Sequence, residues 1–335
     1  MSLTGILNRA AMAVVTLLGV AVIVFGLLRI VPGDPIAMMI SPGASAADIA
    51  ALRVRYGLDS SIPVQFGVWM RDMLAGDFGT SISLKRSVLS LLLERLPATL
   101  ELAFAALLLG VLGGGLIAIL ATLARRTPLD PLIDVLNGLF LAVPDFVWAL
   151  ILVLVLGVAF PVFPMSGRID PSLSQGFATN FYLIESLLTL RFPLFADILS
   201  HMVMPVLALG LPLAAVIVRT LKEALSEAML QDYVALARLK GMSELRLVVQ
   251  EALRNAIGPT LTLTGVQFTF MIGGTVIVER IFSYPGIGNM AIDAVINRDL
   301  PLIQGLVLMF GLIFIVINII VDMLGALFNP RMKHG

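Results

Sequence analysis

The sequence predicts an all-α integral membrane protein with six transmembrane helices, a water-exposed segment after the first helix and a polar helical loop between the fourth and fifth. Hydrophobic residues make up 59% and charged residues 13% of the 335 residues, whereas a soluble protein carries roughly 25% charged residues. The apolar residues also gather in runs long enough to cross a bilayer, which takes about 20 residues. The formal net charge is zero, so nothing in the charge suggests a nucleic-acid partner.

The first predicted domain is a transmembrane helix within residues 1–30, with an apolar run from about Ala10 to Ile30. The run is too long for a cleaved signal peptide and has no small-residue cleavage site, so we interpret it as a retained span. Two prolines and a glycine in Val31–Pro35 end it. Residues 31–95 are rich in charge and are expected to form an extracytoplasmic segment with two short helices and a glycine-rich turn at Ala75–Ser81.

Residues 96–335 are predicted to form a core of five further helices. The second span begins at Pro97, a favourable first-turn residue, and ends near Leu123. Its glycines are interpreted as sites of close helix packing. They are Gly110, Gly113, Gly114 and Gly115. The later spans are expected at about 132–160, 202–218, 261–278 and 302–327, with an amphipathic outer segment at 161–200 that contains a short helix near 181–190.

The distribution of lysine and arginine orients these spans, because short cytoplasmic loops carry an excess of both. Arg9, Arg125–Arg126, the cluster from Arg219 to Arg254 and the pair Arg331 and Lys333 fall on one side of a six-span arrangement. We therefore expect both termini and the polar loop at about 222–258 to lie in the cytoplasm.

The polar stretch Asp232–Pro259 is helical in pattern and lies between two long apolar runs. After Gly241, Ser243 is a predicted N-cap with Glu244 in the first turn. Two short helices joined by a glycine elbow at a membrane face could dock into a partner, but the pattern alone fits an interfacial linker on the lipid equally well. Apolar residues follow at helical spacing on one face of the second helix: Leu245, Val248, Val249, Ala252, Leu253 and Ala256.

Two acidic residues are candidates for a transport pathway. Asp145 lies about thirteen residues into the third span, roughly 20 Å along a straight helix. An ionisable residue at such depth usually faces a cavity or a partner, and Pro144 frees a backbone carbonyl beside it. The alternative for Asp145 is a packed polar contact. Glu279, at the end of the fifth span, is the second candidate.

Several chemistries are missing from the sequence. No lysine follows a glycine, so the chain has no P-loop for ATP, and it contains neither an HExxH nor a GxSxG motif. Without cysteine it can form no disulfide or thiolate metal site. A secondary transporter driven by an ion gradient would need many midplane carboxylates and an internal repeat. An intramembrane enzyme would need a nucleophile–base pair or metal ligands at one depth. We find none of these patterns, while a scaffold or pore-forming subunit stays possible.

The polar stretch resembles the cytoplasmic EAA coupling loop of ABC importer permeases, in the version of the dipeptide/oligopeptide/nickel branch, where DYVxxARxKG and ALRNAxxP are typical. Asp232, Tyr233, Ala237, Arg238, Lys240 and Gly241 carry the match. Further segments typical of that branch follow in order along nearly the whole chain, although Gly325 and Asn329 stand where the branch often has tyrosine and aspartate. These segments are LLRIVPGDP, RYGLD, PVQF, GDFGTS, ERLPATLELA, ERIFSYPGIG, DAVINRDLPLIQG and NIIVDMLGALFNPR.

This resemblance implies a non-catalytic permease subunit of an ATP-driven importer in the bacterial cytoplasmic (inner) membrane. The chain would pair with a sibling permease, bind two cytoplasmic ABC ATPase subunits and receive substrate from an extracytoplasmic binding protein. It would bind no cofactor itself, because ATP and magnesium belong to the ATPases. The branch moves peptides, which we expect here, but also nickel, glutathione and opines.

The resemblance also gives roles to the matched residues. Ala237 would lie on the face that enters a groove in the ATPase, and Tyr233, Arg238 and Lys240 would flank it. Gly241 would permit a backbone conformation or a close approach that a side chain obstructs. The alternative for Gly241 is a helix C-cap without a coupling role.

Overall fold

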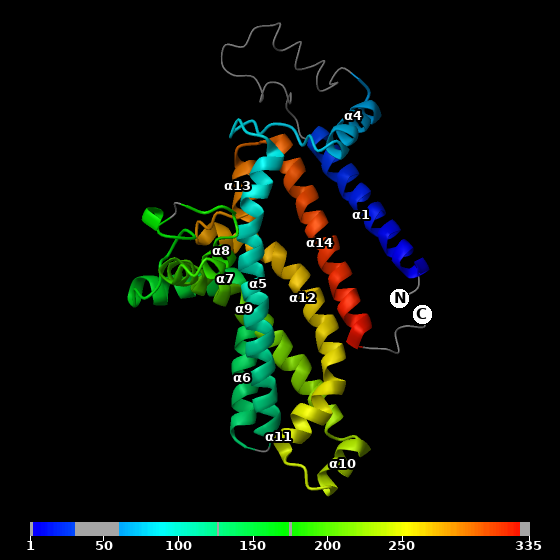
Figure 1. Ribbon diagram of the computed structural model, residues 1–335, viewed down its shortest axis with the longest axis vertical. Coiled ribbons are helices and arrows are strands. Elements are labelled where there is room, and N and C mark those ends of the chain that lie inside the picture. Colours follow the sequence, from blue (N-terminus) through cyan, green and yellow to red (C-terminus); the bar gives the residue numbers. More distant parts are fainter. Residues whose placement is uncertain (1–2, 31–59, 126, 174–175, 329–335) are drawn as a thin grey trace. The chain divides into compact units, whose positions relative to one another are not determined.

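The computed structural model describes residues 3–30, 60–125, 127–173 and 176–328, and it confirms the all-α prediction. Among these residues the only paired extended backbone is an isolated antiparallel bridge between Thr80 and Ser87. The described elements, in chain order, are α1 (Leu3–Ile30), α4 (Ile62–Leu74), α5 (Val88–Leu123), α6 (Leu129–Ala142), α7 (Asp145–Leu152), the π-helical segment η1 (Val153–Ala159), the 3₁₀ turn η2 (Pro171–Leu173), α8 (Tyr182–Leu188), α9 (Phe192–Ala228), α10 (Asp232–Leu239), α11 (Glu244–Arg246), the π-helical segment η3 (Leu247–Ala252), α12 (Leu253–Ile281), α13 (Ile287–Ile296) and α14 (Leu300–Phe328) (Figure 1).

The chain divides into two compact units, which we call the core unit and the flanking unit. The core unit contains Pro97–Asn289 together with the chain from Val316. The flanking unit contains the chain up to Leu96 together with Met290–Ile315. Each unit therefore combines segments that are far apart in the sequence.

Within the flanking unit, aromatic side chains join α1 to α4. The ring centroid of Phe25 on α1 lies 5.4 Å from those of both Phe66 and Trp69 on α4. Aromatic pairs at this separation add to the stability that their burial provides. The break expected at Val31–Pro35 and the RYGLD segment lie outside the described residues.

A glycine-rich turn in the flanking unit encloses a buried carboxylate. Gly76 and Gly79 adopt φ angles of 85° and 79°, which favour glycine, so the predicted turn is present. Ser81 and Ser83, at the end of this turn and just after it, contact Asp299, whose side chain is completely buried. One Asp299 carboxylate oxygen, Oδ2, accepts hydrogen bonds from the hydroxyls of Ser81 and Ser83, at 2.6 and 2.7 Å, and from the Ser83 backbone N–H at 2.9 Å. These bonds compensate for the loss of water around the charge.

The second predicted span starts earlier than expected. Helix α5 begins at Val88, and Pro97 lies inside it. The prediction that Pro97 occupies the first turn is therefore wrong. A proline inside a helix costs one hydrogen bond, but transmembrane helices tolerate this where neighbouring groups satisfy the freed carbonyl.

Helix α9 is the centre of the core unit, and it packs against α6, α7, α8 and α12. Glycines bring α5 close to it. A Cβ on Gly110 would lie 2.8 Å from the Leu213 side chain, and a Cβ on Gly114 would lie 2.7 Å from the Ala214 carbonyl oxygen. These two glycines therefore serve close helix packing, as predicted. Gly113 and Gly115 have open space where their Cβ atoms would lie.

The third predicted span is not one helix. Helix α6 ends at Ala142, and α7 begins at Asp145 after a bend of 100° (Figure 1). Pro144 explains the break, because it cannot donate a backbone hydrogen bond and restricts the residue before it to extended backbone. Val143 indeed has a φ of −97° and a ψ of 121°. The predicted helix near 181–190 is present as α8.

The described residues contain four helices long and apolar enough to cross a membrane, and a fifth if α6 and the bent α7–η1 count as one span. The apolar part of α1, Ala11–Leu27, is shorter. The four helices are Val88–Leu123, Phe192–Ala228, Glu244–Ile281 and Leu300–Val321.

The Asp299 cluster gives a pH-dependent prediction. Burial, the largest single effect, raises the pKa of Asp299, but the hydrogen bonds from Ser81 and Ser83 and from the Ile82 backbone together lower it below its usual value. The ionised carboxylate therefore stabilises the fold fully above the unfolded-state pKa, about 3.9, and loses this effect as the pH falls through the lower folded-state pKa.

We expect hydrogen exchange in residues 80–87, corrected for its intrinsic pH dependence, to accelerate in this acidic range. In Asp299→Asn the exchange should be fast at neutral pH and should show no acidic step. A step of the same size in the variant would contradict the assignment of the effect to Asp299.

Candidate functional site

The polar stretch forms a helical elbow, defined here as α10, α11 and the turn between them. Helix α10 ends in a Schellman motif, in which the N–H of Gly241 donates to the carbonyl of Arg238 at 3.0 Å and that of Met242 to the carbonyl of Ala237 at 3.3 Å. Gly241 has a φ of 83°, which only glycine adopts without strain. Ser243 has the extended backbone of an N-cap, as predicted, but its side chain makes no capping hydrogen bond.

A small apolar cluster closes the elbow on its inner side. Val234, Ala237 and Leu247 are buried together, and Met229 and Met242 pack against them. Ala237 is only 8% exposed, so it faces the chain's own interior. This corrects the expectation that Ala237 lies on an outward face, and it means that a larger side chain there would clash within the elbow itself.

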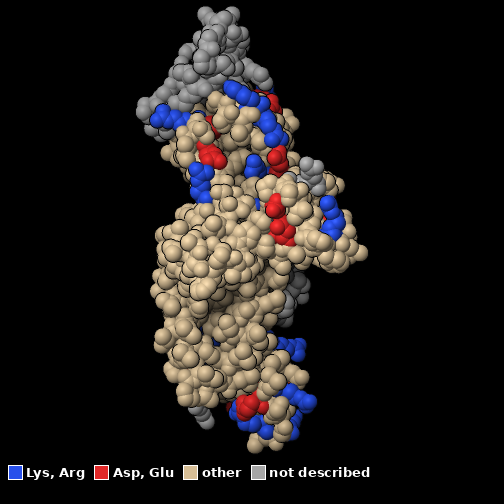
Figure 2. Space-filling model, turned by 90° about the vertical axis from the view of Figure 1, so that its left-hand side faces the viewer, with Lys and Arg blue, Asp and Glu red and all other residues tan. Residues whose placement is uncertain are grey.

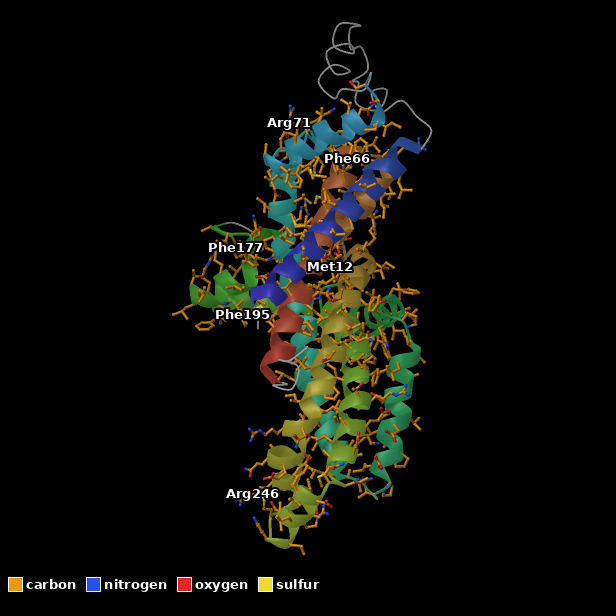
Figure 3. The ribbon with its side chains drawn as sticks, turned by 90° about the vertical axis from the view of Figure 1, so that its right-hand side faces the viewer. Met12, Phe66, Arg71, Phe177, Phe195 and Arg246 are labelled. Atoms are coloured by element: carbon orange, nitrogen blue, oxygen red, sulfur yellow. The ribbon has the colours of Figure 1, made fainter. Side chains whose placement is uncertain are left out.

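The outer side of the elbow combines exposed leucines with charge. Arg238 and Glu244 form an ion pair at 2.9 Å across the turn, and Asp232, Tyr233 and Lys240 are exposed beside it. Charged residues gather at the elbow end of the core unit (Figure 2), where Arg246 also lies (Figure 3). The exposed leucines are Leu230 (75%), Leu236 (55%), Leu239 (86%) and Leu245 (56%).

The elbow continues into a transmembrane helix without a break. Helix α11, the π-helical η3 and α12 form one helix, Glu244–Ile281, with Pro259 inside it. The expectation of a polar helix that ends before a separate span at 261–278 is therefore wrong. The elbow and α12 are thus joined through one continuous helix.

The π-helical turn η3 also changes which side chains are buried. Val248, Ala252 and Ala256 share a buried face, as predicted, and they pack into a cluster with residues of α5 and α9. Leu245 and Val249 are 56% and 42% exposed instead. A π turn holds more residues than an α turn, so a pattern read at 3.6 residues per turn loses its register there.

Asp145 lies at the first position of α7, beside the bend. Its Oδ1 accepts a hydrogen bond from the Phe146 N–H at 2.7 Å. Its Oδ2 lies against α12, where a Cβ on Gly274 would be 2.2 Å away. Asp145 therefore occupies a notch in α12 that exists because residue 274 has no side chain. The estimate of its depth along a straight helix is wrong, because the helix bends at Pro144.

Glu279 is completely buried and holds the loop after α12. Its carboxylate accepts from the Thr99 hydroxyl at 2.6 Å and from the Asn289 N–H at 2.9 Å. Thr99 in turn accepts from the Ile287 N–H at 2.9 Å. Glu279 is thus enclosed by its own chain in this structure, and its predicted place in a substrate pathway stays a prediction.

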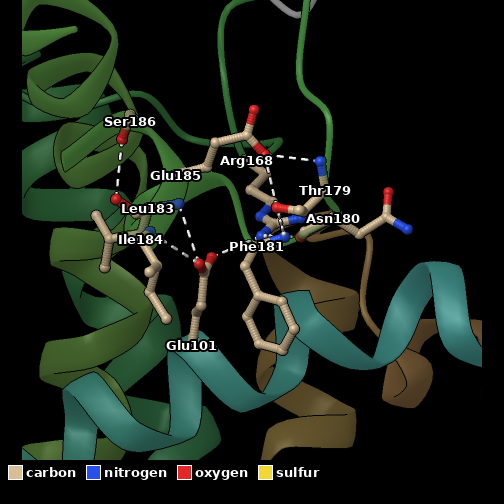
Figure 4. Close-up of polar contacts among 9 residues, drawn as sticks. All are labelled: Glu101, Arg168, Thr179, Asn180, Phe181, Leu183, Ile184, Glu185 and Ser186. Carbon is tan, nitrogen blue, oxygen red and sulfur yellow. Dashed lines mark hydrogen bonds and ion pairs between the residues drawn. The ribbon is translucent and has the colours of Figure 1, made fainter. Parts of the chain in front are cut away.

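The structure also places a buried ion pair that the sequence reasoning did not single out. The guanidinium of Arg168 donates to Oε2 of Glu101 at 2.5 Å, and both side chains are at most 4% exposed (Figure 4). The other oxygen, Oε1, accepts the backbone N–H groups of Leu183 and Ile184 at 3.0 and 3.2 Å. A carboxylate inside a predicted span was the available signal, and it was used for Asp145 but not for Glu101.

Aromatic stacking completes the layer around this ion pair. The Arg168 guanidinium lies 4.1 Å from the ring centroid of Tyr182, which stacks on Phe177 at 3.9 Å. Burial raises the pKa of the neighbouring Tyr284 hydroxyl, so this hydroxyl stays protonated. Hydrogen bonds from Thr179 and from the Ala178 N–H lower the pKa of Glu185. The described residues between Arg168 and Arg191, which are 168–173 and 176–191, therefore form a layer held to α5.

The buried pair gives a stability prediction. Removing one partner leaves an uncompensated buried charge, which costs about 3–5 kcal/mol. We expect Glu101→Leu and Arg168→Met each to lower the thermal unfolding temperature of the membrane-reconstituted protein strongly. The double variant should cost clearly less than the sum of the two, because it leaves no unpaired charge. Additive effects in this double-mutant cycle would show that the pair contributes no coupling energy.

Comparisons with known proteins agree with this architecture. Residues 110–334 match the family described as binding-protein-dependent transport system inner membrane component, and residues 2–103 match its N-terminal region. The MetNI methionine ABC transporter, solved in inward-facing conformations, shares the fold, with a TM-score of 0.55 and 13% identity over 71% of this chain and 96% of that chain.

Three curated relatives match almost from end to end. The di/tripeptide transport system permease protein DppB of Pseudomonas aeruginosa is 35% identical over 99% of both chains. The glutathione transport system permease protein GsiC of Salmonella typhimurium is 36% identical, and the dipeptide transport system permease protein DppB of Escherichia coli is 32% identical, each over 98% of both chains. The chain is therefore a multi-pass inner-membrane protein that belongs to the family of binding-protein-dependent transport system permeases.

Proposed function

We propose that this chain is the permease subunit of an ATP-driven importer, and that it forms with a sibling permease the pathway for short peptides. The observation that carries this proposal is the exposed elbow, which continues into α12 as one helix. A subunit without a P-loop needs an external source of work, and the elbow offers a place to receive it. ATP and magnesium are bound by two partner ATPases, and the present chain contributes no catalytic group.

The elbow is proposed as the ATPase contact. Leu239, 86% exposed, and Leu236, 55% exposed, project from α10, and a short apolar helix of this kind fits a hydrophobic groove. Asp232, Tyr233, Arg238 and Lys240 would lie at the rim of that groove. Ala237 and Gly241 support the contact indirectly, since one packs the elbow and the other fixes its turn.

The exposed stripe of α12 is proposed as the face toward the sibling permease and the pathway. Exposed positions recur every three or four residues along this helix, and Gly273 has open space where its Cβ would lie. Small residues on such a face let a second helix approach closely. The stripe consists of Pro259, Thr262, Val266, Phe270, Gly273 and Ile277.

The proposed substrates are di- and tripeptides. The relatives named above are permeases for dipeptides, di/tripeptides and glutathione, which is itself a tripeptide. Asp145 suits such substrates, because a half-buried carboxylate can pair with the ammonium group at a peptide N-terminus. Nickel and opines are the alternatives within the same importer class.

The proposed orientation places both termini and the elbow in the cytoplasm. The layer from Arg168 to Arg191 and the segment between α1 and α5 then lie outside, where a substrate-binding protein would deliver the peptide. The bias of lysine and arginine toward the elbow side supports this orientation. ATPase closure would move the elbow, and α12 would pass that movement to the pathway.

The ATPase contact is tested with Leu239→Asp. The side chain is exposed, so the fold should be unaffected, whereas a charge in the groove should weaken retention of the ATPase subunits at least about tenfold, given about 1.5–3 kcal/mol for a buried leucine. Co-purification and substrate-stimulated ATP hydrolysis in proteoliposomes provide the measurement. The matched control is Leu188→Asp, since Leu188 is 76% exposed at the other end of the core unit. Equal retention in both variants would refute the contact.

A second variant separates the two roles of Gly241. Gly241→Ala adds a methyl group in open space within this chain, so the left-handed backbone alone costs about 1 kcal/mol. Normal coupling in this variant would assign Gly241 to the C-cap only. A loss of ATPase retention much larger than this local cost would indicate close approach by the partner.

The substrate proposal is tested with Asp145→Asn. Asparagine keeps an acceptor for the Phe146 N–H but loses the charge, so assembly should be normal. Import of a dipeptide and of glutathione should fall about tenfold or more, as expected when a charge-assisted hydrogen bond is lost. An N-acetylated dipeptide, which has no ammonium group, should discriminate little between the two proteins. Unchanged import, or import of Ni²⁺ alone, would contradict the peptide proposal.

A further inference from the structure

The bent third span presents a geometric problem. Helix α6 has 14 residues, and α7 with η1 continues for 15 more after the 100° bend. At 1.5 Å per residue the two arms are about 21 and 22 Å long. Each is shorter than the hydrocarbon core of a bilayer, which is about 30 Å thick. An α6 close to the membrane normal therefore leaves α7–η1 close to the membrane plane (Figure 1).

Two contacts with α12 and its C-cap residue show how far the chain advances along that helix between Asp145 and Gly167. It begins at Asp145, which lies against Gly274, and the chain meets α12 again where the Gly167 N–H donates to the Phe282 carbonyl at 2.9 Å. Phe282 follows Gly274 by eight residues, which is about 12 Å along the helix. An upright α7–η1 alone would rise about 22 Å. The smaller net rise from Asp145 to Gly167, which includes the returning chain after η1, agrees with the 100° bend that turns this segment aside from the direction of α6.

The same contacts place α7–η1 at one side of the membrane. Glu279, whose carboxylate bonds to Thr99 beside the layer that contains Arg168, follows Gly274 by only five residues, or about 8 Å. That layer lies at the end of the core unit opposite the elbow. After η1 the chain turns back, since the Val162 N–H donates to the Leu156 carbonyl at 2.9 Å and the Met165 side chain covers Gly157.

The surface of α7–η1 identifies its surroundings. No charged residue occurs between Phe146 and Met165, and the Trp148 indole is the only polar side chain before Ser166. A helix resting on a membrane surface would carry a charged face, and a helix contact within the membrane would favour small residues. Large apolar side chains of α7–η1 are exposed instead: Phe146 (38%), Leu150 (50%), Ile151 (39%), Leu154 (64%), Val155 (43%) and Val158 (63%).

We propose that α7–η1 lies within the hydrocarbon of the leaflet remote from the elbow, nearly parallel to the membrane plane, and that lipid acyl chains cover its exposed face. The segment then completes no crossing of its own. It is a lipid-embedded support for the ordered layer that begins at Arg168, and it fixes the height of that layer at the membrane surface.

Spin labels on single cysteines test the proposal, because the chain has no cysteine of its own. The labels are placed at Phe146, Leu150, Leu154 and Val158 in the full-length chain, within a lipid-reconstituted importer whose other subunits lack cysteine. The matched control is the exposed face of α5, with labels at Phe104, Leu108, Leu112 and Leu116, which are 65%, 51%, 63% and 58% exposed. Collision with oxygen and with a water-soluble nickel chelate gives the depth of each label.

We expect the control labels to span about 18 Å of depth from Phe104→Cys to Leu116→Cys, twelve residues apart. The labels from Phe146→Cys to Val158→Cys should span less than about a third of that, with high oxygen and low chelate accessibility. A depth ladder equal to that of α5 would show an upright span and overturn the proposal. Low access for both reagents would show a protein partner on this face, and high chelate access would show water, and either result would also overturn it.

Discussion

The core unit depends on the requirement that charges and backbone groups removed from water find partners inside the protein. Two carboxylates at the end opposite the elbow meet this requirement in full. Glu101 accepts a guanidinium and two backbone N–H groups, and Glu279 accepts a hydroxyl and a backbone N–H. A buried carboxylate left without these donors would cost several kcal/mol. Each therefore specifies the positions of the segments that supply its donors, and together they connect α5, the layer that contains Arg168 and α8, and the loop after α12.

These connections support the proposal that a movement of the elbow, driven by partner ATPases, reaches the substrate pathway. The elbow is closed by its own apolar cluster and continues as one helix to Ile281. At the far end of this helix Glu279 is bonded to Thr99 of α5. This helix is therefore fixed to α5 at Glu279 and exposed at the elbow, so a force on the elbow would move the helix about its fixed end. Asp145, in the notch at Gly274, lies between these two ends. A displacement of α12 would therefore change the surroundings of this carboxylate directly.

The bend at Pro144 makes the part of the core unit remote from the elbow differ in packing from the part near the elbow. Toward the elbow, α5, α6, α9 and α12 pack lengthwise, with glycines at the closest approach of α5 and α9. Toward the other end, α7–η1 turns aside and the chain forms a layer held by Arg168 and stacked aromatic rings. Lengthwise packing resists separation of the helices, whereas a transverse segment can rest on lipid and set the level of the layer above it.

The sequence by itself determined the class of protein, most helices and the glycine elbow, because hydrophobic run length, proline position and cap residues act locally. It also indicated the close packing at Gly110 and Gly114 and the turn at Gly241. Only the tertiary structure decided what depends on segments far apart in the chain. Glu101 finds Arg168, and Glu279 finds Thr99. Ala237 turns inward against Leu247, which no pattern of residues 232–241 could show. Pro144 marked a possible break in the sequence, but the size of the bend follows from the packing of α7 on α9 and α12. Local chemistry fixes where helices begin and end, whereas the partners of buried charges follow from how those helices pack.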